Sequence, residues 1–286
     1  QTKILPLLRM GGPWALSAIA GVLLANSEKL VLARVTSVEI LAYYSVAFTL
    51  ANMATMFSGS MAQSLVPAFS QLLAPEKQIQ LNSLFSRTLR VNIFGLLPLL
   101  TILAVVGRPF FSIWAGADFG RESTLPFYVL LIGLFFNLNA YVSSSLLLSA
   151  GRTDLLAKMF WIELIPYLFL TIFMSIQFGA TGAAMAWSLR VIVDCFVSIF
   201  LAKRIGKVEF SFLKNRNILL AGILILSVPI AISLFSDAFS YWLVVILFMS
   251  IFVYFWLIWR FIATSDEKYW ISDLYGKTLR VITNSS

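Results

Sequence analysis

The sequence lacks histidine and holds a single cysteine, Cys195, among its 286 residues. These absences exclude a disulfide framework, a Cys/His zinc site and acid–base catalysis by histidine. Charged residues are also scarce, at 12% of the chain, which is about half of their share in an average soluble domain. Hydrophobic residues make up 60%. Because so few polar groups could not cover a soluble protein of this length, we expect part of its surface to face lipid.

Apolar stretches of membrane-crossing length recur along the chain, separated by short polar breaks. Most hold the roughly 20 apolar residues that a helix needs to cross about 30 Å of hydrocarbon. The ten-residue alternation of membrane β-strands is absent. The sequence therefore predicts an all-α integral membrane protein with about eight transmembrane helices, at residues 13–35, 41–66, 91–107, 125–150, 159–178, 180–202, 217–236 and 240–262.

Lysine and arginine are distributed unevenly between the two sides of these spans. With the N-terminus in the cytoplasm, sixteen of the 21 fall on the cytoplasmic side, and Arg190 lies inside a span. The opposite side holds Lys29, Arg34, Arg108 and Arg121. This positive-inside bias predicts that both termini are cytoplasmic. It also accounts for the net charge of +8, so no nucleic-acid partner is expected.

The longest polar connection, Lys203 to Asn217, separates six spans from a final pair. We therefore expect a six-helix lobe at residues 1–205, a cytoplasmic linker with a terminal transmembrane hairpin at 206–264, and a cytoplasmic tail at 265–286. The basic and then apolar N-terminus imitates a signal peptide. However, the chain opens with Gln1 and the apolar run continues to Val35. We interpret it as a first span in a piece of a longer protein.

Polar residues mark one face of the second span. They recur every three or four residues, at Ser45, Thr49, Asn52, Thr55, Gly59 and Gln63. Such a stripe either packs helices together or faces a water-filled cavity, and both readings stay open. On the first span, the adjacent charges of Glu28 and Lys29 point about 100° apart, so at least one should face a partner or a cavity. An interfacial anchor is the alternative.

The deepest charges belong to Arg190 and Asp194, one helical turn apart, with Glu163 at a similar depth on the preceding span. A guanidinium between two carboxylates would form a satisfied intramembrane ion cluster. It would either fix helix register or take part in substrate or ion coupling. On the fourth span, Asn137, Tyr141 and Ser144 share a face, for which interhelical hydrogen bonding is the favoured reading over a cavity wall.

Five sequence motifs resemble those of a known transporter family. They are ANSEKLVLARV at 25–35, YYSVA at 43–47, FFSIWAGADFG at 110–120, LLLSAGRTDLLAK at 146–158 and GATGAAMAWSLRVIVD at 179–194. Their order and spacing resemble the lipid-linked oligosaccharide flippases of the multidrug/oligosaccharidyl-lipid/polysaccharide exporter superfamily. The resemblance covers roughly residues 1–205, and the final hairpin is similar to helices thirteen and fourteen of longer members.

The resemblance implies that this chain is the C-terminal lobe of a two-lobed transporter whose N-terminal lobe is missing. Such transporters flip a polyprenyl-diphosphate-linked glycan across the bacterial or archaeal cytoplasmic membrane for surface polysaccharide biosynthesis, without enzymatic activity or a cofactor. The family residues matching Asn26, Glu28 and Lys29 lie on a cavity-forming helix, with an aspartate in place of Glu28.

A diphosphate-sugar head group needs cationic and amide contacts in a wet cavity. We expect Lys29, Asn52 and a third candidate, Arg34, to supply them, with Ser45 and Thr49 hydrogen-bonding sugars. A peptidoglycan-precursor flippase, a drug exporter and a packing subunit without a cavity remain alternatives. So does a membrane-embedded glycosyltransferase or polymerase, although the best acidic pair, Asp118 and Glu122 beside Arg121, reads more readily as a loop salt bridge.

Overall fold

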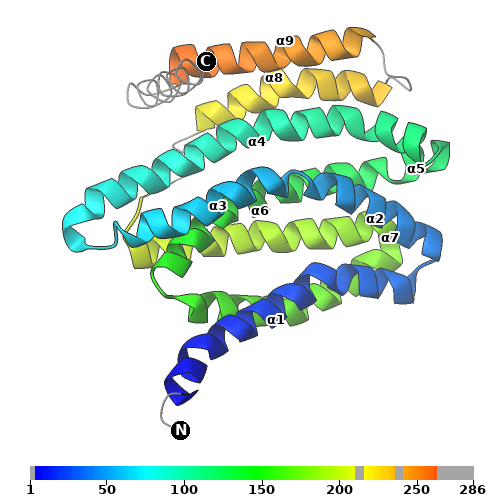
Figure 1. Ribbon diagram of the computed structural model, residues 1–286. Coiled ribbons are helices and arrows are strands. Elements are labelled where there is room, and N and C mark those ends of the chain that lie inside the picture. The colour runs from blue at the N-terminus through cyan, green and yellow to red at the C-terminus, as the bar shows by residue number, and fades with distance from the viewer. Residues whose placement is uncertain (1–3, 210–215, 236–240, 263–286) are drawn as a thin grey trace, which may run out of the picture. The chain divides into compact units, whose positions relative to one another are not determined.

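A computed structural model describes residues 4–209, 216–235 and 241–262. These residues are helical apart from short connections, and they contain no strand (Figure 1). The chain forms two compact units, residues 1–210 and 211–286. The first unit contains α1 (Ile4–Val35), α2 (Val38–Asn52), α3 (Thr55–Ser70), α4 (Gln78–Trp114), α5 (Ala117–Glu122), α6 (Thr124–Ser149) and α7 (Thr153–Gly206). The second contains a pair of packed helices, α8 (Arg216–Phe235) and α9 (Tyr241–Leu257).

The all-α membrane architecture is confirmed. Among the described residues, α4, α6, α7 and α9 are long and apolar enough to cross a bilayer, and α2 with α3 could supply a fifth crossing. The span predicted at 91–107 is the middle of α4, which continues through Pro98 and Pro109 to Trp114. The count of eight spans, the three predicted domains and the predicted tail, which lies outside the described residues, stay predictions.

Helix α7 is a hairpin of two arms, residues 153–178 and 180–206. Gly179 takes φ 55° and ψ −131° between them, a backbone conformation open to glycine and costly for other residues. The arms approach so closely that a Cβ on Gly182 would overlap the carbonyl of Met174. This turn separates the two spans predicted at 159–178 and 180–202, so the 54-residue helix accommodates both.

The second predicted span is not one continuous helix. It bends by 48° between α2 and α3. At the bend, Met53 and Ala54 donate their N–H groups to carbonyls only three residues back, so the helix tightens there. No proline or glycine marks this site, which is why a continuous helix was the natural expectation. Asn52 is exposed at the end of α2, whereas Ser58, on α3 beyond the bend and outside the polar stripe, is buried.

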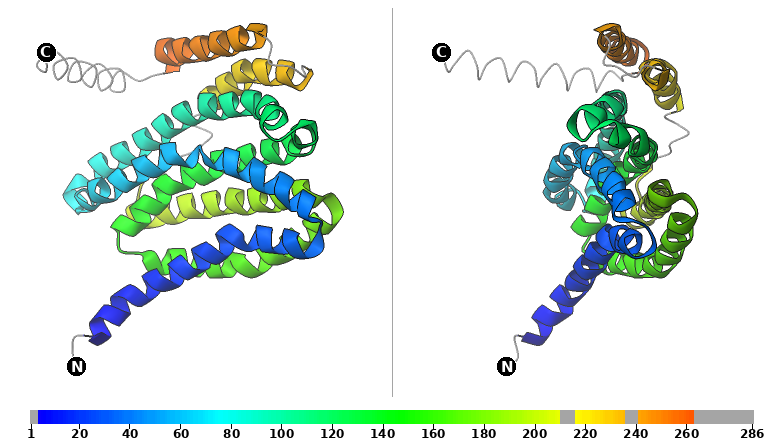
Figure 2. Two further views of the ribbon diagram at one scale, coloured as in Figure 1. Left: turned by 45° about the vertical axis from the view of Figure 1, so that its right-hand side comes forward. Right: turned by 90° about the vertical axis from the view of Figure 1, so that its right-hand side faces the viewer.

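Helix α6 is central to the first unit and contacts α2, α3, α4 and α7, while α1 packs along α7 (Figures 1 and 2). A buried polar junction joins three of these helices. Asn92 on α4 accepts a hydrogen bond from the Ser58 hydroxyl on α3 at 2.8 Å. Its amide donates to the Leu138 carbonyl and the Asn139 side chain of α6, at 3.1 and 3.2 Å. In a bilayer, such bonds hold helices together where the hydrophobic effect is absent.

Candidate functional site: a polar cavity among α1, α2, α6 and α7

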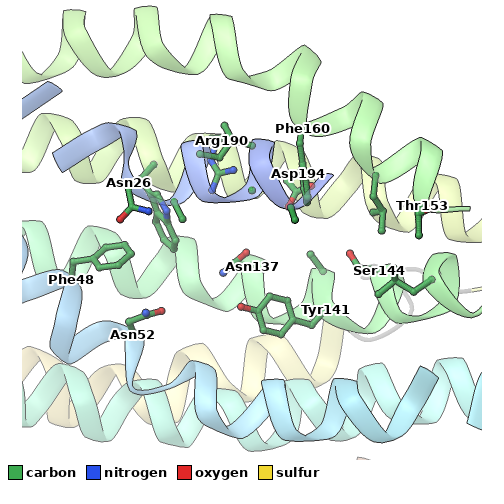
Figure 3. A pocket seen from close by; sticks show the side chains of 18 of the residues that line it. Asn26, Phe48, Asn52, Asn137, Tyr141, Ser144, Thr153, Phe160, Arg190 and Asp194 are labelled. Carbon is green, nitrogen blue, oxygen red and sulfur yellow. The ribbon is translucent and has the colours of Figure 1, made fainter. Parts of the chain in front are cut away.

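Helices α1, α2 and α6 and both arms of α7 line an open cavity of about 700 Å³ (Figure 3). Its polar lining consists of Asn26, Lys29, Asn52, Asn137, Tyr141, Ser144, Thr153, Arg190 and Asp194. Aromatic rings of Phe48, Phe160 and Trp187 also line the cavity, together with small and aliphatic residues. Polar groups gathered inside a bundle of apolar helices are costly unless they are paired or wet, so they mark a candidate site for a polar ligand.

The structure brings together three of the six residues predicted to line a cavity. Asn26, Lys29 and Asn52 border the same space from α1 and α2. Ser45 and Thr49 do not border it, and the Thr49 hydroxyl donates to the Ser45 carbonyl at 2.8 Å. The roles assigned to these residues stay predictions.

Glu28 is fully buried between α1 and α7 and does not border the cavity. Its Oε2 accepts a hydrogen bond from the Tyr167 hydroxyl at 3.1 Å. The sequence predicts that at least one of the two adjacent charges faces a partner or a cavity. In the structure, Glu28 faces a partner and Lys29 faces the cavity.

Lys29 is held against an aromatic wall. Its ammonium lies 4.7 Å from the centre of the Phe48 ring, a geometry that stabilises a cation over the face of an aromatic ring. Phe48 in turn meets Trp187 edge to face, with ring centres 5.7 Å apart. Within the described residues, no salt bridge involves Lys29. The lysine thus presents a positive charge to the cavity that no carboxylate neutralises directly.

Arg190 and Glu163 meet on facing arms of α7, but the satisfied three-residue cluster that the sequence predicts is not formed. Among the described residues, no salt bridge joins Arg190 to Asp194, and both Glu163 carboxylate oxygens lack a hydrogen-bond partner. The Arg190 Nη1 and Glu163 Oε2 atoms lie 3.9 Å apart. Asp194 accepts a hydrogen bond from Ser198 at 3.4 Å. Arg190 and Asp194 also border the cavity, where Figure 3 shows them close to one another. The cluster therefore connects the hairpin of α7 to the cavity wall, and its role in coupling or register stays a prediction.

Tyr167 was missed by the sequence reasoning. The Arg190 guanidinium lies 5.0 Å from the centre of its ring, and its hydroxyl bonds to Glu28. Tyr167 therefore links the charged end of α1 to the ion cluster of α7. The available signal was its spacing, four residues after Glu163 on the same face.

The polar face of the fourth span divides between the two roles considered for it. Asn137, Tyr141 and Ser144 border the cavity, so the favoured packing reading does not describe them. Interhelical hydrogen bonds are instead made by neighbouring residues on the buried side of α6. The Asn139 side chain accepts a hydrogen bond from the Asn92 amide, and the Ser145 hydroxyl donates to the Ala62 carbonyl at 3.2 Å. Helix α6 therefore uses one face for interhelical bonds and another for the cavity.

The chemistry of the lining suits a ligand that is both anionic and rich in hydroxyl groups. Lys29 and Arg190 supply two cations, against the single carboxylate of Asp194. The amides of three asparagines can donate and accept hydrogen bonds, as sugars require. Among the described residues, no group of three or more histidine, cysteine, aspartate or glutamate side chains could hold a metal ion.

Sequence comparisons agree with this chemistry. A family model described as "Polysaccharide biosynthesis protein" matches residues 1–123. The chain is 26% identical over 198 residues to a "Putative O-antigen transporter" of Shigella flexneri, covering 69% of this chain and 47% of that protein. It is 25% identical over 191 residues to a "Probable low-salt glycan biosynthesis flippase Agl15" of Haloferax volcanii, covering 63% and 39%. The chain thus spans less than half the length of either curated relative. By sequence, the chain is therefore similar to proteins named as an O-antigen transporter and a glycan biosynthesis flippase.

Proposed function

We propose that this chain forms one lobe of a transporter that flips a polyprenyl-diphosphate-linked oligosaccharide across the cytoplasmic membrane for surface polysaccharide biosynthesis. The observation that carries the proposal is the cavity itself, a polar space with two cations that is lined by apolar helices. The names of the two relatives support the choice of a glycan-bearing lipid.

Each part of the head group has a counterpart in the cavity. Lys29 and Arg190 would bind the diphosphate, because cationic donors form the strongest hydrogen bonds to phosphate oxygens. Asn52 and Asn137 would bind sugar hydroxyls, and the nearby Trp187 and Phe48 rings would pack against sugar faces. Glu28 would act from behind the wall, orienting the cluster through Tyr167 rather than touching the substrate.

The proposal includes a second lobe that completes the cavity, and alternating access between the two lobes. It also includes the cytoplasmic location of both termini, based on the distribution of lysine and arginine. The membrane is the cytoplasmic membrane of a bacterium or archaeon, and the role is transport without chemical change to the substrate.

The test replaces Lys29 by alanine in the full-length protein, in cells that lack the native copy. Losing the unpaired cation should lower surface polysaccharide at least tenfold, since a charged hydrogen bond contributes about 1.5–3 kcal/mol. Lys29→Arg should retain most export, because it keeps the charge. The measurement is surface glycan by immunoblot, alongside the amount of protein in the membrane and of lipid-linked glycan in the cell.

Arg121→Ala is the matched control, since Arg121 is exposed and pairs with Glu122 outside the cavity. It should export normally. Normal export by Lys29→Ala would remove Lys29 from the mechanism. Transfer of sugar to an acceptor by the purified full-length protein would instead favour an enzyme.

A further inference from the structure

A second hollow lies outside the proposed transport site, between α1 and the first arm of α7. It is a groove of about 430 Å³. Its walls are two apolar stripes with helical spacing, Leu23, Leu30 and Val31 on α1 and Leu164, Leu168 and Ile172 on α7. The polar exceptions in its lining are Ser27, whose hydroxyl bonds to its own helix, and Arg34.

The groove and the cavity occupy different flanks of α1. The helix packs on α7 through a buried face that includes Leu24, Glu28 and Leu32. Lys29 borders the cavity and Arg34 borders the groove. Being five residues apart, their side chains leave the helix about 140° apart. The groove therefore does not continue the cavity, and we treat it as a separate site from the one that would hold the glycan head group.

The dimensions of the groove match one leaflet of a bilayer. From Leu23 to Arg34 the helix rises roughly 17 Å at about 1.5 Å per residue. Half of a hydrocarbon core is about 15 Å. Helix α1 ends at Val35, so Arg34 stands at the end of the groove, where the helix gives way to a loop. For the membrane span that the sequence predicts at 13–35, this end corresponds to the level at which lipid head groups meet the hydrocarbon.

Arg34 is a cation that has no salt-bridge partner within the part of the chain that the structure describes. Its side chain is exposed. A guanidinium presents paired donors that match the oxygens of a phosphate group. An apolar slot with one such cation at its mouth is complementary to a molecule with a long hydrocarbon chain and an anionic phosphate.

We propose that this groove binds an anionic phospholipid of the surrounding membrane, with one acyl chain between α1 and α7 and its phosphate on Arg34. The occupant is a bilayer lipid rather than the glycan carrier, because the groove lies on the flank of α1 away from the cavity. The proposal does not depend on the proposed transport function.

The test is native mass spectrometry of the purified full-length protein, titrated with dioleoyl-phosphatidylglycerol or dioleoyl-phosphatidylcholine. The wild type should bind the anionic lipid in preference. Arg34→Ala should reduce that preference about tenfold, the effect of losing one charged phosphate contact. Arg34→Lys should retain part of it, since the charge remains without the paired donors. Arg121→Ala, which removes an exposed cation away from the groove, should match the wild type.

A second variant tests the apolar slot independently of charge. Leu168→Trp adds bulk to the groove wall and should weaken the binding of both phospholipids. The proposal is overturned if Arg34→Ala keeps the full preference for phosphatidylglycerol, or if Leu168→Trp binds both lipids like the wild type. Displacement of phosphatidylglycerol by an equal concentration of polyprenyl phosphate would also overturn it, by assigning the groove to the carrier lipid.

Discussion

Replacing Arg190 by methionine would separate a structural role of the ion cluster from a role in transport. Methionine keeps much of the apolar stem but removes the cation that pairs with the Glu163 carboxylate. Both side chains of the Arg190–Glu163 pair are only 12% exposed. Water therefore compensates only in part for the missing charge beside Glu163, although Arg190 also borders the cavity.

The expected loss follows from the geometry. At 3.9 Å, the attraction between two unit charges is about 4 kcal/mol for an effective dielectric constant of about 20. Removing one partner of a buried pair typically costs about 3–5 kcal/mol, because the other charge stays buried without compensation. We expect Arg190→Met to lower the free energy of unfolding by that amount. Adding Glu163→Leu should recover about 2 kcal/mol or more, since it removes the stranded carboxylate.

The assay is denaturant-induced unfolding of the purified full-length protein, followed by circular dichroism, with export measured in parallel. Arg121→Ala is the control, because its pair with Glu122 is exposed and should contribute nothing measurable. A double variant no more stable than Arg190→Met would refute the claim that the pair holds the arms of α7 together. A fully stable Arg190→Met protein that fails only in export would assign Arg190 to the substrate alone.

Two further predictions concern packing and use the same unfolding assay. Gly182→Ala forces the arms of α7 apart at the Met174 carbonyl and should lower the free energy of unfolding by about 1–3 kcal/mol. Gly59→Ala is the control and should be tolerated, because the space around Gly59 is open. Equal stability of the two variants would contradict the close approach of the arms. Asn92→Ala removes three interhelical hydrogen bonds, among them the one from Ser58. At about 0.6 kcal/mol for each bond, it should lower the free energy of unfolding by about 2 kcal/mol. A double-mutant cycle of Ser58→Ala and Asn92→Ala that shows no coupling energy would count against the polar junction of α3, α4 and α6.

Parts of the site were predictable because they obey helical periodicity. Arg190 and Asp194 are four residues apart, so any helix there must place them on one face. The meeting of Arg190 with Glu163 required only that two successive spans run antiparallel through a short turn. Lys29 was identifiable because a charge within an apolar span needs a partner or a cavity.

Other parts depended on the direction in which each helix faces its neighbours. Glu28 and Lys29 are adjacent in sequence, yet one is buried against Tyr167 and the other borders the cavity. Helical periodicity predicts that their side chains point in different directions, but it does not predict which neighbouring helix each side chain meets. The bend at Met53 is marked by no proline or glycine in the sequence, so one continuous span was predicted there.

The sequence by itself determined that part of the surface faces lipid, that the fold is all-α, and where most apolar spans lie. The reason is that hydrocarbon requires long apolar helices, in which the backbone groups hydrogen-bond to one another. It also determined that charges at Lys29 and Arg190 need an explanation. Only the tertiary structure decided that the two cations border one cavity while Arg34 lies at a separate apolar groove. The reason is physical: helical spacing fixes angles around one axis, whereas a cavity depends on how several axes pack against one another.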